Sequence, residues 1–156
     1  MERGTAGFEN DAARPLTPKG ERQLRKTAVA MKKMDLHLEL ILSSPFLRAK
    51  QTAEIVAAGL KLKKRLKFSD ELQPDGSFKK LFMQIGEMKP APENILLAGH
   101  EPYLSRMISL LVSGGENMAV DFKKGGLCKL EAEKLRNGRC AALAWLLTPN
   151  QMKRMA

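Results

Sequence analysis

The sequence predicts an α/β fold, a three-layer sandwich whose sheet is mostly parallel and has an antiparallel edge. Short apolar segments alternate with amphipathic helical segments, which is typical of parallel sheets covered by helices on both faces. A last pair of apolar segments flanks Asn137-Gly138, the dipeptide most typical of a hairpin turn. With 156 residues, 44% of them hydrophobic, the chain has the size of one domain, and we expect a single domain over residues 1–156.

The first elements follow from capping signals and hydrophobic spacing. Thr17 followed by proline is an N-cap and first-turn signal, and apolar residues at helical spacing then predict an amphipathic helix over about 17–34. "LELILSS" (38–44) is a short apolar run that predicts a strand. After Pro45 the helical spacing returns and continues to Gly59.

The second half repeats this alternation and closes with two strands. The predicted elements are a weak strand at 65–72, a helix at 76–88, a buried strand at 94–100, a proline-initiated helix to about Val112, and two strands at 126–135 and 139–147. We find no internal repeat, low-complexity tract or interdomain linker.

The composition indicates the cellular compartment and the state of the cysteines. No apolar run approaches the ~20 residues needed to span a bilayer, and residues 1–20 lack the apolar segment of a secretory signal, so we expect a cytoplasmic protein. The two cysteines, Cys128 and Cys140, lie twelve residues apart without metal-like spacing. We therefore expect buried thiols rather than a disulfide or zinc site, and no structural metal.

The net charge of +10 favours an anionic partner, which could be nucleic acid, a phosphorylated substrate or an acidic protein surface. Nucleic-acid modules usually add stacking aromatic residues to a basic surface, but the aromatic content here is only 5%. The densest basic run, "KLKKRLK" (61–67), contains none and is better interpreted as a solvated loop and strand entry. We expect neither a nucleic-acid nor a membrane partner.

Two polar residues follow predicted strands, where ligands bind in open α/β sheets. Arg48 lies about one helical turn beyond the strand end at Ser43-Ser44, and His100 directly leaves the 94–100 strand. Alone, Arg48 could be a solvated arginine and His100 a structural histidine. Together, a guanidinium fork, a helix N-terminus and an imidazole predict a pocket for a phosphoryl oxyanion.

Three segments carry a resemblance to a known family. "DAARPLTPKGERQLRKTA", "LILSSPFLRAKQTAEIVA" and "ILLAGHEPYLSRMISLL" closely resemble the SixA-type phosphohistidine phosphatases of the histidine phosphatase (phosphoglycerate-mutase-like) superfamily. The resemblance runs from about Gly4 to the closing hairpin. It implies a phosphoglycerate-mutase-like fold and a cofactor-independent, metal-independent phosphatase that forms a phosphohistidine intermediate. Its substrate would be a phosphohistidine-containing protein of bacterial signalling or phosphotransfer, or a small phosphorylated molecule.

The resemblance also implies roles for individual residues. Arg48 resembles the second phosphate-binding arginine, His100 the second histidine, Arg14 a further pocket arginine, and Gly4 the glycine of the family's Arg-His-Gly motif. In that family the histidine of this motif, at the end of a first strand, attacks phosphorus.

The first strand and the nucleophile are lacking, because Glu2 and Arg3 precede Gly4. A guanidinium stays protonated and has no lone pair to attack phosphorus. The remaining histidine, His37, precedes the amino end of a strand and is predicted to be a surface residue. Either the sequence starts late or carries a deletion relative to an active protein, as the intact pocket residues favour, or the protein binds phosphate without turnover. A missing first strand would also leave a gap or exposed edge in the sheet.

A general acid is only weakly indicated. Glu71, in "SDELQPDG" after a predicted strand, is the candidate, although an ordinary loop carboxylate is at least as good an interpretation. The weak acid signal favours a substrate with an N–P bond over phosphate esters, since an imidazolium leaving group needs little help from an acid. Nucleic-acid binding, as a rival class, rests on charge alone and predicts steep salt dependence.

Overall fold

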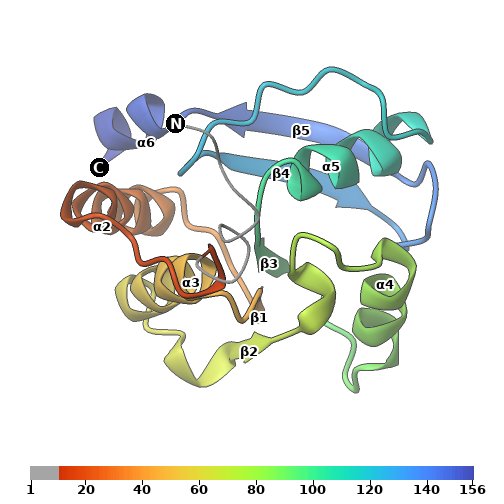
Figure 1. Cartoon of the computed structure of the whole chain (residues 1–156), viewed down its shortest axis with the longest axis horizontal. Helices are drawn as coiled ribbons and strands as arrows, with labels where there is room; N and C mark the ends of the chain where they lie inside the picture. Colours follow the sequence, from red (N-terminus) through yellow and green to blue (C-terminus); the bar gives the residue numbers. More distant parts are fainter. Residues whose placement is uncertain (1–10) are drawn as a thin grey trace.

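A computed structural model describes residues 11–156 and confirms the α/β fold class (Figure 1). In chain order its elements are α2 (Pro18–Lys33), β1 (Leu40–Ser43), α3 (Leu47–Gly59), β2 (Leu66–Phe68), α4 (Phe78–Glu87), β3 (Ile95–Ala98), α5 (Tyr103–Ser113), β4 (Leu127–Ala132), β5 (Ala141–Leu147) and α6 (Pro149–Met155). Short 3-10 turns lie at Lys63–Arg65 and Asp70–Leu72.

The strands form two sheets. A parallel sheet has the order β2-β1-β3, with Ser43 of β1 opposite Phe68 and Ala98, and β4 pairs with β5 in a separate antiparallel sheet. The predicted antiparallel edge is therefore present as a hairpin, but within residues 11–156 no strand joins it to the parallel sheet. Because β1, β2 and β3 run in parallel, their carboxyl ends meet at one edge.

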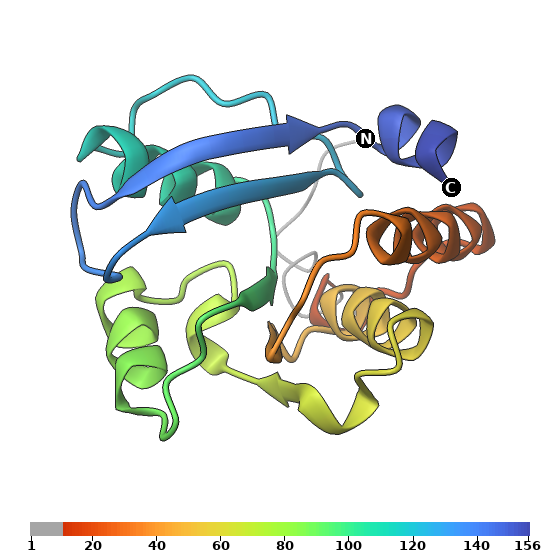
Figure 2. The same ribbon diagram turned by 180° about the vertical axis from the view of Figure 1, so that it is seen from behind.

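Helices α2, α3 and α6 lie on one side of the parallel sheet and α4 and α5 on the other (Figures 1 and 2). A hydrophobic core fills the space on each face. Successive side chains of a strand point to opposite faces, so Ile41 and Leu42 of β1 enter different cores. One core combines Ile41 with residues of α2, α3 and α6, including Met31, Ala53, Val56 and Met152. The other combines Leu42 with residues of α4 and α5, including Leu81, Phe82, Met107 and Leu111.

The α2–α3 pair is closely packed. The N-cap Thr17 accepts a hydrogen bond from the Gly20 N–H (3.0 Å), as predicted, and lysines occupy the last turn of α2, where they complement the helix dipole. At Gly59, the end of α3, an added Cβ would lie 2.6 Å from the Ala28 Cβ of α2. Only glycine permits this approach between the helices.

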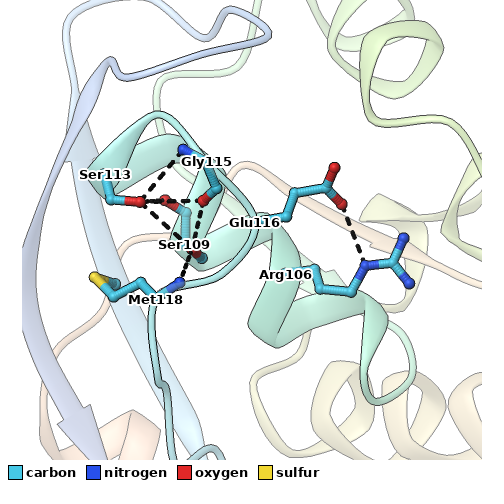
Figure 3. Close-up of polar contacts among 6 residues, drawn as sticks. All are labelled: Arg106, Ser109, Ser113, Gly115, Glu116 and Met118. Carbon is cyan, nitrogen blue, oxygen red and sulfur yellow. Dashed lines mark hydrogen bonds and ion pairs between the residues drawn. The ribbon is translucent and has the colours of Figure 1, made fainter.

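Side chains of α5 hold the loop that follows it (Figure 3). Ser109 is fully buried; its hydroxyl donates to the Gly115 carbonyl and accepts from the Met118 N–H (2.8 Å). Gly114 ends the helix in the left-handed conformation (φ 89°), and Arg106 forms an ion pair with Glu116 (3.2 Å). Through these contacts the serines of α5 fix the loop that follows the helix, so their role is structural.

The basic run of residues 61–67 behaves as predicted. Its residues form the Lys63–Arg65 turn and the entry to β2, and its five cationic side chains are exposed. They form no ion pair with any residue in the described part of the chain. Since β2 is an edge strand of the sheet formed by residues 11–156, these charges oppose edge-to-edge association.

Two expectations about elements were wrong in detail, and one helix was missed. Strand β4 ends at Ala132 and β5 begins at Ala141, so the hairpin is not a tight turn at Asn137-Gly138; the Arg136 guanidinium donates to the Arg139 carbonyl (2.7 Å) within this longer connection. Helix α6 was not predicted. The predicted buried strand β3 is only half-buried, because in the described chain it has a strand neighbour on one side only.

The predicted thiols are both free, but Cys128 and Cys140 are half-buried rather than fully buried. Burial raises the pKa of the Cys128 thiol to about 11, which keeps it protonated and unreactive at neutral pH. Among residues 11–156, no group of three or more His, Cys, Asp or Glu side chains could hold a metal ion. None of the helices described has the length and hydropathy of a membrane span.

Candidate functional site

The candidate site lies at the carboxyl edge of the parallel sheet, where β1 and β3 end side by side. Ser44 directly follows β1, and its N–H donates to the carbonyl of Ala98, the last residue of β3 (2.9 Å). His100 follows two residues later. Pairing of two adjacent parallel strands thus brings together segments that are far apart in the sequence, at the edge where α/β proteins bind ligands.

His100 is held by the segment that follows β1. Its Nε2 lies 2.8 Å from the Ser44 Oγ, and its ring meets the Phe46 ring edge-on, with 5.2 Å between centroids. Burial lowers the pKa of His100 below its ordinary value; the nearby Arg48 charge lowers it further, while Asp11 opposes the shift. The imidazole is therefore predominantly neutral at pH 7.

Arg48 lies in the first turn of α3, and its Nη2 is 2.9 Å from the Asp11 Oδ1. Both side chains are partly exposed. The N-cap of this helix, Phe46, provides no side-chain hydrogen bond, and within residues 11–156 no side chain caps the first-turn N–H groups beside Arg48. A guanidinium and the positive end of a helix dipole thus face the same region, which favours an anion.

Asp11 is the site residue that sequence reasoning missed. Its partner Arg48 is 37 positions away, and an aspartate three residues before Arg14 carries no motif that points to such a contact. The electrostatic coupling of Asp11 to His100 is likewise visible only in the fold.

Arg14 lies in an exposed loop near the start of α3. The loop is anchored where the Leu16 N–H donates to the Gln51 Oε1 (2.7 Å). The Arg14 guanidinium makes no hydrogen bond or ion pair with any residue from 11 to 156. Its role as a pocket arginine stays a prediction. Gly4, Glu2 and Arg3 lie outside the described residues.

Glu71 has structural partners. Its Oε2 accepts the Ser77 N–H (2.7 Å), and its carbonyl accepts the Tyr103 hydroxyl. An added Cβ at Gly76 would lie 2.0 Å from the same carbonyl oxygen, so the 71–77 turn needs glycine there. The carboxylate helps to close this turn, and its role as a general acid stays a prediction. His37 is exposed and lies 3.5 Å from the Asp35 carboxylate, as expected for a surface residue.

Three groups therefore lie at one edge of the parallel sheet: the Arg48 guanidinium, the mostly neutral His100 imidazole, and the start of α3, which no described side chain caps. Such groups can hold a tetrahedral oxyanion through charge-assisted hydrogen bonds.

Residues 3–73 match the model of the histidine phosphatase superfamily (branch 1). An uncharacterised protein of Picosynechococcus sp. (strain PCC 7002) is 34% identical over 132 residues, which cover 84% of this chain and 79% of that protein. The phosphohistidine phosphatase SixA of Escherichia coli K12 is 26% identical over 156 residues, 98% of this chain and 94% of that protein. The chain belongs to the histidine phosphatase superfamily.

Solved structures agree with this assignment. A structure of the protein histidine phosphatase SixA complexed with tungstate superposes with a TM-score of 0.79 at 26% identity, covering 92% of this chain and 89% of that one. A putative phosphohistidine phosphatase SixA from Agrobacterium tumefaciens shows the same fold, with a TM-score of 0.70 at 20% identity over 89% of this chain and 86% of that one. The phosphoglycerate-mutase-like fold expected from the resemblance is confirmed.

Proposed function

We propose that this protein is a SixA-like phosphatase that removes phosphoryl groups from phosphohistidine proteins of bacterial signalling or phosphotransfer systems. The observation that supports it most is the convergence of Arg48 and His100 at the ends of adjacent structural segments, with Ser44 in contact with His100. The similarity to SixA of E. coli along nearly the whole chain points in the same direction.

In this reaction Arg48 binds two phosphoryl oxygens with its planar fork, and His100 donates a hydrogen bond to a third. In the family's reaction a histidine attacks phosphorus, the N–P bond of the substrate breaks, and the substrate imidazole leaves with its proton. This sequence has Arg3 where that histidine stands, so residues 1–156 do not include the nucleophile of this step. Water then hydrolyses the phosphoenzyme and releases inorganic phosphate. Because the phosphohistidine ring carries a proton on its other nitrogen, it leaves as neutral imidazole without an acid, and Glu71 can stay hydrogen-bonded to Ser77 without loss of rate.

A second candidate function is non-catalytic binding of phosphate or a phosphoprotein. The observation that favours it is the sequence Glu2-Arg3-Gly4, in which an arginine stands where the family motif has its nucleophile. The only histidines in the sequence are His37 and His100. His37 is exposed and lies beside Asp35, and His100 forms a hydrogen bond with Ser44. The same pocket would then hold a phosphoryl group without breaking its bond.

Calorimetric titration with inorganic phosphate and with vanadate tests the pocket that both functions share. We expect Arg48→Ala to weaken phosphate binding at least about tenfold, because a charge-assisted bidentate contact is lost. Lys50→Ala is the matched control, because it removes a cation from the same helix. The Lys50 Nζ lies over the Phe68 ring, 5.8 Å from its centroid, and we expect its loss to change the phosphate affinity less than about twofold. Equal phosphate affinity in Arg48→Ala and the wild type would remove the pocket assignment.

Turnover separates the two functions. The protein is mixed with a phosphotransfer domain phosphorylated on histidine, and inorganic phosphate and acid-labile phosphoprotein are followed over time. Phosphate release that exceeds the protein in amount establishes the phosphatase. Binding of the phosphorylated domain, weakened by Arg48→Ala and without phosphate release, establishes the binding function instead.

A further inference from the structure

Ser43 is the last residue of strand β1 and Ser44 directly follows it, and both are fully buried. Their hydroxyl groups have different partners. The Ser43 Oγ donates to the Ser44 carbonyl (2.9 Å) and stays within its own strand end, whereas the Ser44 Oγ reaches across to His100 Nε2 (2.8 Å). Only the second serine contacts a residue of the candidate site.

The hydrogen bonds of Ser44 determine the direction of this contact. Its Oγ accepts a hydrogen bond from the Phe46 N–H (3.2 Å), and a hydroxyl group has a single proton of its own to donate. Among residues 11–156, the one acceptor that this proton reaches is His100 Nε2. A fully buried hydroxyl without an acceptor is costly, so the proton points from Ser44 to the imidazole.

An imidazole that accepts at Nε2 carries its own proton at Nδ1. No residue in the described part of the chain forms a hydrogen bond with this nitrogen, which leaves Nδ1–H as the free donor of the ring. The Phe46 ring packs edge-on against the imidazole and limits its rotation. An imidazolium would also donate at Nε2, and the Ser44 proton would then lose its acceptor, so this contact favours the neutral ring.

We propose that Ser44 is a positioning residue that fixes neutral His100 as the Nδ1–H tautomer, so that the ring offers phosphoryl oxygen a donor and not a lone pair. The role in binding phosphoryl oxygen rests on the proposed function, whereas the tautomer itself is a property of the unliganded protein. In the opposite tautomer an unprotonated Nδ1 would face an anion with a lone pair, and binding would first require a proton.

Nitrogen-15 NMR of the labelled, unliganded protein tests the tautomer directly, because the two ring nitrogens have distinct shifts when one is protonated. The sequence has only two histidines, and exposed His37 is an internal reference. We expect His100 to show protonated Nδ1 at a pH where it is neutral. Ser44→Ala should shift it towards the Nε2–H form and weaken phosphate binding about five- to tenfold, as for loss of one hydrogen bond.

Ser43→Ala is the matched control, since Ser43 is equally buried and adjacent in sequence but its hydroxyl donates to the Ser44 carbonyl and not to His100. It should keep the wild-type tautomer, and Ser44→Thr, which restores a hydroxyl, should regain both the tautomer and the phosphate affinity. An Nε2–H tautomer in the wild type, or an unchanged tautomer in Ser44→Ala, would overturn the proposal. If Ser44→Ala fails to fold, the wild-type and Ser44→Thr spectra still decide it. Absence of phosphate binding in the wild type would instead remove the proposed function, because the tautomer is measured without ligand.

Discussion

Arg48 is the residue on which the candidate site depends, and it is already paired with an anion of the protein itself. The Asp11 carboxylate lies 2.9 Å from the guanidinium, where it can compete with a phosphoryl oxygen. Asp11 also stabilises the charged form of His100, whereas Arg48 and burial oppose it. One carboxylate therefore influences both groups that we propose to bind phosphate.

Asp11→Asn should strengthen phosphate binding by roughly three- to tenfold, because it removes a negative charge close to the bound anion at a partly exposed position. Calorimetry with inorganic phosphate measures the change. Glu21→Gln, which removes the same charge from the exposed ion pair with Arg25 on α2, is the control and should leave the affinity unchanged. Weaker binding in Asp11→Asn would show instead that the carboxylate aligns the guanidinium.

At this scale, sequence could predict which residue types lie at the sheet edge but not their partners. Arg48 and His100 were found because each follows an apolar strand and the parallel arrangement places such ends together. The contacts of Asp11 and Ser44 join positions 37 and 56 apart, and they depend on how loops and rings pack after the strands have paired. No local spacing encodes that geometry.

At the scale of elements, long periodic segments were predicted well and short ones poorly. The predicted helix over 17–34 is α2, Pro18–Lys33, because sixteen residues give a clear apolar stripe between an N-cap and a basic end. Helix α6 has only seven residues and no such stripe. The sequence signal for this helix is a capping box. The Thr148 hydroxyl accepts from the Gln151 N–H, and the Gln151 side-chain oxygen accepts from the Thr148 N–H.

The close approach of α2 and α3 at Gly59 gives a prediction about helix packing. Gly59→Ala should destabilise the protein by about 1–3 kcal/mol, because the new Cβ would overlap that of Ala28 and force the helices apart. Gly86→Ala is the matched control in α4, where an added Cβ has no neighbour within 4 Å; it should be neutral or stabilise by up to about 1 kcal/mol through helix propensity. Urea unfolding measures both, and equal effects would contradict the packing argument.

At the scale of the whole molecule, the sequence predicted the fold class but not the division of the strands into two sheets. Apolar periodicity identifies strands, whereas pairing depends on contacts between distant segments. In the described residues, β3 ends the parallel sheet, and the β4–β5 hairpin packs through side chains such as Leu127 and Leu130 against the cores on either face. Shared cores, rather than shared strand pairing, connect the two sheets.

Global stability should fall between about pH 10 and 12 because of one phenol. Tyr103 is almost fully buried, and burial together with the Glu71 charge raises its pKa to about 12 from an unfolded value near 10. In this interval the unfolded chain has lost the proton and the folded chain retains it, so unfolding is favoured as pH rises, by up to roughly 2–3 kcal/mol.

Because the sequence has a single tyrosine, tyrosinate absorbance follows Tyr103 alone. We expect a midpoint near the raised value, and urea unfolding at several pH values should show the wild type losing more stability than Tyr103→Phe over the same interval. All other groups are the same in both proteins, and their contribution cancels in the difference. A midpoint at the ordinary phenol value would contradict the assigned burial effect.

The alternation of Ile41 and Leu42 between the two cores has a consequence for how this protein can diverge. A polar substitution at either position weakens one core, and a change of register exchanges the two side chains and weakens both. We therefore expect a deep mutational scan to find β1 among the least tolerant segments, while the exposed basic turn before β2 accepts most changes. The surface around the candidate site can then change while the frame that carries Ser44 and Arg48 stays the same.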